Sequence, residues 1–328
     1  MAEQASSKVV VWVALAGNVL VAATKAGAAL WTGSAAMLSE AVHSFVDCGN
    51  EILLLYGMRR AARTADADHP IGYGRELYFW SFIVALLVFA LGAGVSIYEG
   101  ISHLRQPAPI EHVAVNYIVL ALAFVFEGVS WVVSLRKFQT AKGSLGYYEA
   151  FRKSKDPATF MVLFEDSAAL LGILIAAAGT YATSSWQMPL ADGIASLAIG
   201  LVLAATATLL ARESKSLLIG ERANKHLSDS IMRIAASVPE LKANGVLTAQ
   251  LAPDQILVAL SLEFDDHLQA PRIEELVVDI ERQIRAAHPE VVSLFVKPQT
   301  PDAYRQAVKR RFEIAPAEQN SNPAQAPL

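Results

Sequence analysis

Six apolar stretches, each about 20 residues long, constrain the fold of this chain more than any other feature. They lie near residues 9–30, 36–58, 77–101, 113–135, 158–182 and 188–211. A stretch of about 20 apolar residues can cross the hydrocarbon core of a bilayer as an α-helix. The first stretch is too long to be the apolar part of a signal peptide. We therefore predict an α-helical membrane bundle of six transmembrane helices in residues 1–212.

The composition supports a membrane location and narrows the classes of partner. The chain is 54% hydrophobic and 18% charged, which is too apolar for an ordinary soluble domain of this length. Its net charge of -4 comes from nearly balanced numbers of acidic and basic residues. The chain therefore lacks the overall positive charge that would attract a nucleic acid partner. The single cysteine, Cys48, excludes an intramolecular disulfide and a multi-thiolate zinc site. The expected surroundings are the lipid bilayer.

Basic residues in the predicted loops indicate the orientation in the membrane. They concentrate in segments 59–75 and 136–156, whereas segment 102–112 holds only Arg105. Short cytoplasmic loops of membrane proteins carry an excess of Lys and Arg. Six helices also place both ends of the chain on one side. We therefore predict a multi-pass integral membrane protein with both termini cytoplasmic, in the inner or plasma membrane if the host is bacterial.

Hydropathy falls after the last apolar stretch, and residues 213–300 have the pattern of a small soluble domain. The expected elements are a helix at 225–237, strands at 243–251 and 255–264, a helix at 271–287 and a strand at 290–297. This α-β-β-α-β order predicts a cytoplasmic ferredoxin-like α+β domain with a small antiparallel sheet. Residues 301–328 are expected to form a C-terminal tail, disordered in its Pro- and Asn-rich part from Ala315.

Four ionisable residues interrupt the second apolar stretch: Glu40, His43, Asp47 and Glu51. A carboxylate at the centre of a bilayer costs about 2.5–3.5 kcal/mol on insertion scales, so these side chains must face protein or water. At 100° per residue they fall within about an 80° sector of one helix face. Such a stripe either lines a pathway for ions or joins helices through polar contacts.

Two residues of this stripe have the spacing of metal ligands. His43 and Asp47 stand one helical turn apart, so an imidazole nitrogen and a carboxylate oxygen can converge on one ion. The fifth apolar stretch adds Glu165 and Asp166 at membrane depth. Two helices can then supply a tetrahedral nitrogen and oxygen site, which suits Zn²⁺, with Mn²⁺, Fe²⁺ and Co²⁺ as alternatives.

Several other polar residues within the apolar stretches have two interpretations each. Asn18 and Asn50 are expected to be interhelical hydrogen-bond partners rather than ligands. Lys25 either extends to the interface or pairs with an acid, and Glu127 lies deep enough to be functional. Asp192 serves either an ion entrance or a helix cap.

The loop after the second stretch contains Asp66, Asp68 and His69, followed by a Pro and two glycines. Two carboxylates and an imidazole could hold a second, weaker metal ion there. The alternative is a turn stabilised by hydrogen bonds from an Asp side chain and by Gly and Pro backbone preferences.

Three motifs carry a resemblance to a known family. They are Gly33–Asp47 (GSAAMLSEAVHSFVD), His69–Glu76 (HPIGYGRE) and Glu213–Glu221 (ESKSLLIGE). Through them the chain resembles the cation diffusion facilitator family of metal-ion/proton antiporters from about Gly17 to Pro298. The resemblance implies a homodimer whose second and fifth helices hold the transported ion and whose cytoplasmic domain contributes to the dimer contact.

Further residues place the resemblance within the family and mark departures from it. Lys155–Asp156–Pro157 and Glu165–Ala169 look most like a zinc-transporter branch also found in animal organelles. Many relatives carry a His four residues before the fifth-helix aspartate, where this chain has Val162. Glu165, water or a residue from another helix would then fill the fourth ligand position.

In the cytoplasmic domain, Glu274 and Phe295 stand where relatives often have histidines, and Lys297 stands where an acid is usual. We therefore expect this domain to dimerise rather than to bind metal.

These features predict a secondary transporter that exports a divalent transition-metal cation, zinc being favoured, in exchange for protons by alternating access. Metal binding requires a neutral imidazole and ionised carboxylates, so metal and protons compete for the ligands. The alternatives are a transporter of Mn, Fe or Co, a membrane metal sensor that does not transport, and an intramembrane metalloenzyme. The sequence has no H-E-x-x-H or G-x-S-x-G motif, so we expect no enzyme and no prosthetic group.

Overall fold

The structure is a computed structural model that describes residues 2–107, 110, 112–142, 146–147, 150–151, 155 and 157–313. Asp156 of the Lys155–Asp156–Pro157 motif and the predicted disordered segment from Ala315 therefore lie outside the described residues. The chain divides between Ile219 and Gly220 into two compact units.

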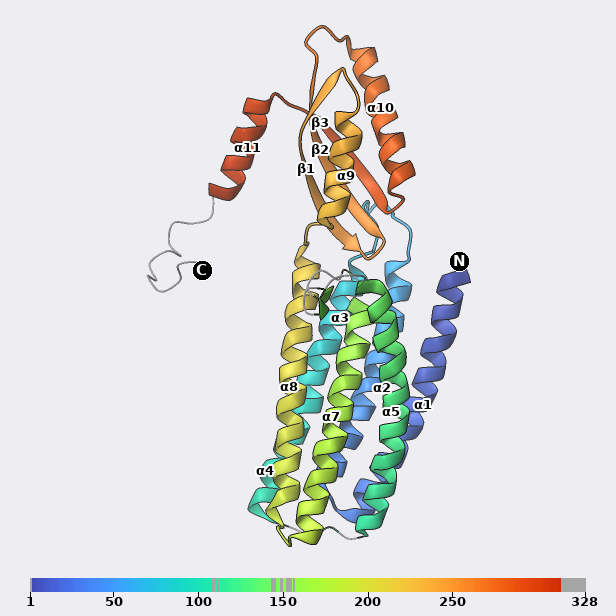
Figure 1. Cartoon of the computed structure of the whole chain (residues 1–328), viewed down its shortest axis with the longest axis vertical. Helices are drawn as coiled ribbons and strands as arrows, with labels where there is room; N and C mark the ends of the chain where they lie inside the picture. Colours follow the sequence, from blue (N-terminus) through green and yellow to red (C-terminus); the bar gives the residue numbers. More distant parts are fainter. Residues whose placement is uncertain are drawn as a thin grey trace. The chain divides into compact units, whose positions relative to one another are not determined.

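Long helices that lie side by side form the first unit (Figure 1). They are α1 (Ala2–Thr32), α2 (Ala35–Ala61), α5 (Val113–Lys142), α7 (Pro157–Ser185) and α8 (Leu190–Ile219), and between α2 and α5 the chain forms α3 (Glu76–Leu87), η1 (Val88–Ala93) and α4 (Gly94–Arg105). Helix α8 continues to Ile219, so residues 213–219 belong to this unit and not to the soluble domain predicted to begin at 213.

Four helical segments of this unit are long and apolar enough to cross a membrane, among the described residues. They are Glu76–Arg105, Val113–Thr140, Phe160–Ser185 and Leu190–Ile219. Helix α2 is 27 residues long but carries Glu40, Asp47 and Glu51, which lower its hydropathy. The structure thus has a helical transmembrane domain with four clear apolar spans, and the sixfold count stays a prediction.

Close helix packing depends on glycines where α4 meets α8. A Cβ atom on Gly100 would lie 2.9 Å from the carbonyl oxygen of Gly193, and one on Gly200 would lie 3.1 Å from the backbone nitrogen of Ile97. Small residues at such an interface allow two helix backbones to approach each other in the membrane. The segment just before α4, η1, is a six-residue π-helix.

Asp192 of α8 fixes the beginning of α2. Its carboxylate accepts hydrogen bonds from Ser34 Oγ (2.6 Å) and from the backbone N–H of Ala35 (2.5 Å). Ser34 is itself the N-cap of α2 and accepts a bond from the N–H of Met37. Of the two interpretations of Asp192, the structure therefore supports the cap. It satisfies N–H groups that the first turn of a helix leaves without partners.

The second unit contains a three-stranded sheet and helices α9 and α10 (Figure 1). Its elements are α9 (Lys225–Ala236), β1 (Leu241–Ala252), β2 (Gln255–Phe264), α10 (Ala270–Ala287), β3 (Val291–Pro298) and α11 (Pro301–Glu313). The strand order is β1-β2-β3; β1 pairs with β2 antiparallel, and β2 with β3 parallel. The predicted antiparallel sheet is thus wrong for β3, because α10 carries the chain back across the sheet before β3 starts.

The core of this unit lies between one face of the sheet and the helices. Ile231 of α9 and Ile280 of α10 pack with Val258 and Leu260 of β2, and all four are fully buried. Residues 301–313, which we predicted to be part of a tail, form α11.

Candidate metal centre

The polar stripe of α2 is enclosed by protein. Glu40 and His43 are almost fully buried, and Asp47 is 9% exposed to solvent. His43 Nδ1 lies 3.5 Å from Asp47 Oδ1, so the two predicted ligands are neighbours as their spacing required. Neither nitrogen of His43, nor Asp47 Oδ1, has a hydrogen-bond partner among the described residues. This pair therefore offers a nitrogen and an oxygen to a cation.

The two consecutive acids of α7 contact different helices. Glu165 Oε1 accepts a 2.9 Å hydrogen bond from Asn50 Nδ2 of α2. Asp166 Oδ2 accepts bonds from Ser130 Oγ (3.0 Å) and Ser134 Oγ (3.2 Å), both on α5. Neighbouring positions on an ideal helix point about 100° apart, which accounts for this division.

The predicted ligands are not assembled around one point in this structure. Within the part of the chain that is described, no three His, Cys, Asp or Glu side chains are grouped closely enough to hold a metal ion. His43 and Asp47 are adjacent, and the acids of α7 lie within electrostatic range of Asp47. A four-ligand centre thus requires an arrangement in which Asp166 leaves α5 and approaches His43 and Asp47.

Sequence reasoning missed two residues at this site, Ser130 and Ser134. Their spacing of four residues in the fourth apolar stretch places both hydroxyls on one helix face, and this signal was available. The interhelical roles predicted for two amides are confirmed: Asn50 bonds to Glu165, and Asn18 Nδ2 donates to Glu51 Oε1 at 2.8 Å.

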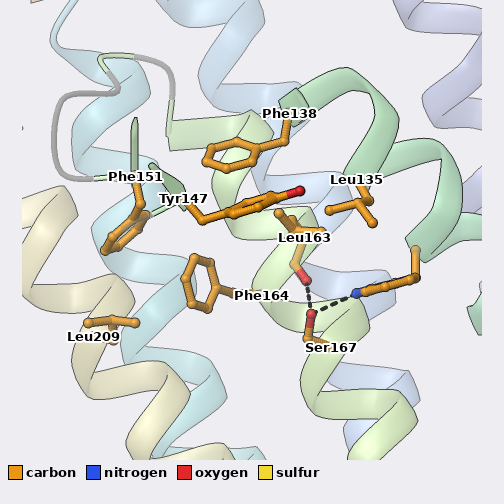
Figure 2. Close-up of a pocket in the computed structure, with 9 residues that line it drawn as sticks. Leu135, Phe138, Tyr147, Phe151, Leu163, Phe164, Ser167 and Leu209 are labelled. Atoms are coloured by element: carbon orange, nitrogen blue, oxygen red, sulfur yellow. Dashed lines mark hydrogen bonds between the residues drawn. The ribbon is translucent and has the colours of Figure 1, made fainter. Parts of the chain in front are cut away.

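Ser167, the residue after Asp166, faces a separate apolar pocket (Figure 2). Its Oγ donates to the carbonyl oxygen of Leu163 and accepts from Trp131 Nε1 at 2.9 Å. The pocket has a volume of about 360 Å³, and its lining comprises Trp131, Leu135, Phe138, Tyr147, Phe151, Leu163, Phe164, Ser167 and Leu209. The lining residues that the structure describes include no carboxylate or imidazole, the groups predicted to bind the metal.

Lys25 of α1 pairs with an acid, which decides between its two interpretations. Its Nζ lies 3.1 Å from Glu40 Oε2 and 2.9 Å from Ser44 Oγ, both on α2. Glu127 Oε1 of α5 lies 3.8 Å from the same nitrogen. The buried lysine therefore contacts one end of the polar stripe.

The loop candidate for a second metal site forms a turn. Asp66 Oδ1 accepts from the N–H of His69 (2.8 Å) and of Asp68 (3.1 Å), and Oδ2 accepts from Tyr73 Oη (2.7 Å). These hydrogen bonds hold the pKa of Asp66 below its ordinary value, the bond from Tyr73 having the largest effect. Asp66, Asp68 and His69 are exposed and take part in this turn, and the second metal site stays a prediction.

Comparison with known families decides what kind of chain carries this site. The family described as the cation efflux transmembrane domain matches residues 11–219, which include all of α2, α5, α7 and α8. The chain belongs to the cation efflux family. This is the cation diffusion facilitator family whose motifs the sequence resembles.

Individual members of the cation efflux family are similar over most of the chain. The proton-coupled zinc antiporter SLC30A9, mitochondrial, of Xenopus laevis is 35% identical over 268 residues, which are 79% of this chain and 48% of that protein. Its Homo sapiens counterpart is 34% identical over 260 residues, 78% of this chain and 46% of that protein. The cation-efflux pump FieF of Shewanella oneidensis is 23% identical over 283 residues, 84% of this chain and 90% of the pump.

The chain spans about half the length of the SLC30A9 proteins that it matches. These relatives are named as transporters, and the family to which the chain belongs is one of transporters and not of enzymes. The prediction that the chain is no enzyme is thereby confirmed.

Proposed function

We propose that this protein is a secondary transporter that exports a divalent transition-metal cation, zinc in the first place, from the cytoplasm in exchange for protons. The observation that carries the proposal is the buried His43–Asp47 pair on α2 of a cation efflux family member. Nitrogen and oxygen donors suit Zn²⁺, and relatives named as proton-coupled zinc antiporters support the same metal.

The transport site in this proposal comprises His43, Asp47, Glu165 and Asp166. In the structure Asp166 is bonded to α5, while His43 and Asp47 have atoms without hydrogen-bond partners among the described residues. A shift of α7 toward α2 would exchange the serine contacts of Asp166 for the metal. The site would then open to each side of the membrane in turn, with water or Glu165 in the place of the histidine absent at Val162.

The proposed transporter is a homodimer, and an exposed apolar row on the sheet supports this. Leu247 of β1 pairs with Ala259 of β2, which pairs with Phe295 of β3, so their side chains lie in line on the face away from α9 and α10. Leu247 is 47% and Phe295 60% exposed. Apolar residues in a row favour contact with a second copy of the same face. The proposed orientation places both termini in the cytoplasm, following the positive loops.

The test is metal flux into liposomes that contain the purified full chain and an entrapped metal indicator. We expect zinc uptake, and we expect it to become faster when an imposed pH gradient drives protons out of the liposomes. Uptake of Mn²⁺, Fe²⁺ and Co²⁺ should be slower. Asp47→Asn and Asp166→Asn should abolish uptake because each removes an anionic ligand.

Glu99→Gln is the matched control, because it removes a carboxylate of α4 outside the proposed site. Wild-type flux in the absence of any other protein would exclude a sensor that does not transport. Full activity of Asp47→Asn would contradict the site, and faster uptake of another metal would contradict the choice of zinc.

A further inference from the structure

Lys25 of α1 is fully buried, and it is the one charged residue of that helix between Val9 and Thr32. Both Lys25 and Glu40 have 0% exposure, and Glu127 has 6%. The three side chains come from α1, α2 and α5, and Lys25 Nζ lies 3.1 Å from Glu40 Oε2 and 3.8 Å from Glu127 Oε1. Ionisable residues inside a membrane domain are costly, and they mark ion or proton pathways more often than structural contacts.

The charges of this cluster do not balance when every group is ionised. One ammonium group faces two carboxylates, which leaves one negative charge away from water. An uncompensated buried charge is strongly unfavourable. A proton that binds one of the two carboxylates converts it to a neutral carboxylic acid and balances the cluster.

The environment of Glu40 is a second, independent observation. Its Oε1 is buried and has no hydrogen-bond partner among the described residues, although its Oε2 contacts Lys25. This atom points at Gly172 of α7, where a Cβ atom would overlap with it. A glycine at that point leaves room for a carboxyl group, and the unpaired oxygen is available to a proton.

We propose that Lys25, Glu40 and Glu127 form a proton-binding site, separate from the metal ligands, that carries the counter-transported proton. The inference rests on the proposed function, since it assigns the proton of that exchange. Glu40 precedes His43 by one turn on α2, so one helix carries both the proton site and the metal pair.

Charged and titratable groups from the surrounding helices complete this environment. Glu40, His43 and Asp47 of α2 and Glu127 of α5 interact electrostatically with Lys25. Glu165 and Asp166 of α7 interact in turn with Asp47, and Glu127 itself interacts with Asp47, Glu51 and Asp166.

The contacts of the cluster link proton binding to helix movement. Lys25 joins α1 to α2 and α5, and Glu40 packs against α7, which carries Glu165 and Asp166. A proton on either glutamate removes one of the two anionic partners of Lys25. The ammonium group then shifts its interaction to the remaining carboxylate, and the packing of α1 against α2 and α5 changes with it.

The experiment compares zinc flux in proteoliposomes with and without an imposed pH gradient, using the full chain. We expect Glu127→Gln to lose the acceleration by the pH gradient while its zinc affinity, measured by equilibrium dialysis, stays that of the wild type. Glu99→Gln, the same change on α4, should keep the acceleration.

A second variant keeps the inference testable if Glu127→Gln does not fold. Lys25→Met combined with Glu40→Gln and Glu127→Gln removes all three charges of the cluster, so no buried charge is left without a partner. It should also bind zinc and lose the acceleration. Full acceleration in both variants would overturn the inference and leave the transport proposal intact.

Weakened zinc binding in both variants would assign the cluster to the metal site and would also overturn the inference. An absence of zinc flux in the wild type would instead overturn the transport proposal itself.

Discussion

Asn50 of α2 donates a 2.9 Å hydrogen bond to Glu165 of α7, whereas the next residue, Asp166, is bonded to Ser130 and Ser134 of α5. The helix that carries the proposed metal acids is thus joined to two partners through two consecutive residues. Glu165 already lies beside α2, and Asp166 must exchange serine hydroxyls for a metal ion. The contacts of Asp166 therefore determine how readily the proposed site forms.

Replacement of Ser130 and Ser134 by Ala should strengthen zinc binding. Both hydroxyls donate to Asp166 Oδ2, and these bonds must break before the carboxylate can bind an ion together with His43 and Asp47. Because a hydrogen bond to a charged group contributes about 1.5–3 kcal/mol, their loss should raise zinc affinity about tenfold or more. Equilibrium dialysis of the full chain against zinc measures the change. Ser167→Ala is the control, since Ser167 bonds to Leu163 and Trp131 instead; unchanged affinity in the double variant would refute the prediction.

Val162→His should raise zinc affinity and increase the preference for zinc over Mn²⁺. Val162 precedes Asp166 by one helical turn, so an imidazole there can reach an ion bound by that carboxylate. An additional nitrogen ligand favours zinc over Mn²⁺, and a gain of about 1.4 kcal/mol corresponds to about tenfold in affinity. Competition dialysis with the two metals measures it. Val162→Leu tests the effect of size alone, and equal gains in both variants would count against ligation.

Gly100→Ala should destabilise the packing of α4 against α8. The added Cβ would lie 2.8 Å from the backbone nitrogen of Leu197 and 2.9 Å from the carbonyl oxygen of Gly193, atoms that cannot rotate away. Overpacking of this kind costs about 1–3 kcal/mol. Thermal unfolding in detergent is the measurement. Gly128→Ala is the control because a Cβ there meets nothing within 4 Å, and a matching loss of stability in both variants would disprove the packing argument.

Tyr73→Phe should raise the pKa of Asp66 toward its ordinary value of about 3.9. The Tyr73 hydroxyl is the largest cause of the lowered pKa of this carboxyl. A lowered pKa in the folded state means that the ionised carboxylate stabilises the turn above its unfolded pKa, and that this contribution disappears as pH falls through the folded value. The turn of the variant should therefore loosen at a higher pH than that of the wild type.

Carbon-13 NMR of the Asp66 carboxyl group, followed through an acid titration, measures this pKa directly. Tyr98→Phe, at an exposed position of α4, should leave it unchanged. An identical midpoint in Tyr73→Phe and the wild type would show that the hydroxyl has no influence.

Features that depend on one segment alone, such as the extent of an apolar helix or the spacing of residues along it, could be predicted from the sequence. The second apolar stretch at 36–58 corresponds to α2 at Ala35–Ala61, and the spacing of His43 and Asp47 placed these side chains beside each other. The contact of Asp166 with α5 could not be predicted, because it depends on which helices are neighbours. The predicted antiparallel direction of β3 was wrong for a related reason. Alternation of apolar residues indicates a strand, but it does not indicate whether that strand runs parallel or antiparallel to its neighbour.

The sequence contains signals for α11, which we did not predict, but none for the π-helix η1. Helix α11 has Pro301 at its start, Asp302 in its first turn and Arg310 and Arg311 in its last, which are signals that favour a helix. By contrast, the π-helix η1 follows no composition rule that would separate it from the α-helix around it, since its apolar residues suit either.

The π-helix η1 has a consequence for how chains of this family are compared. Its hydrogen bonds enclose one residue more than those of an α-helix, so the helix that follows is rotated by about 100° relative to an uninterrupted one. The rotation applies to every residue of α4, including Gly100, which packs against α8. In evolutionary terms the segment is equivalent to a single-residue insertion inside a membrane span. A relative that lacks the π-turn therefore needs a gap within Val88–Ala93, and an ungapped comparison would pair each residue of α4 with the wrong neighbour.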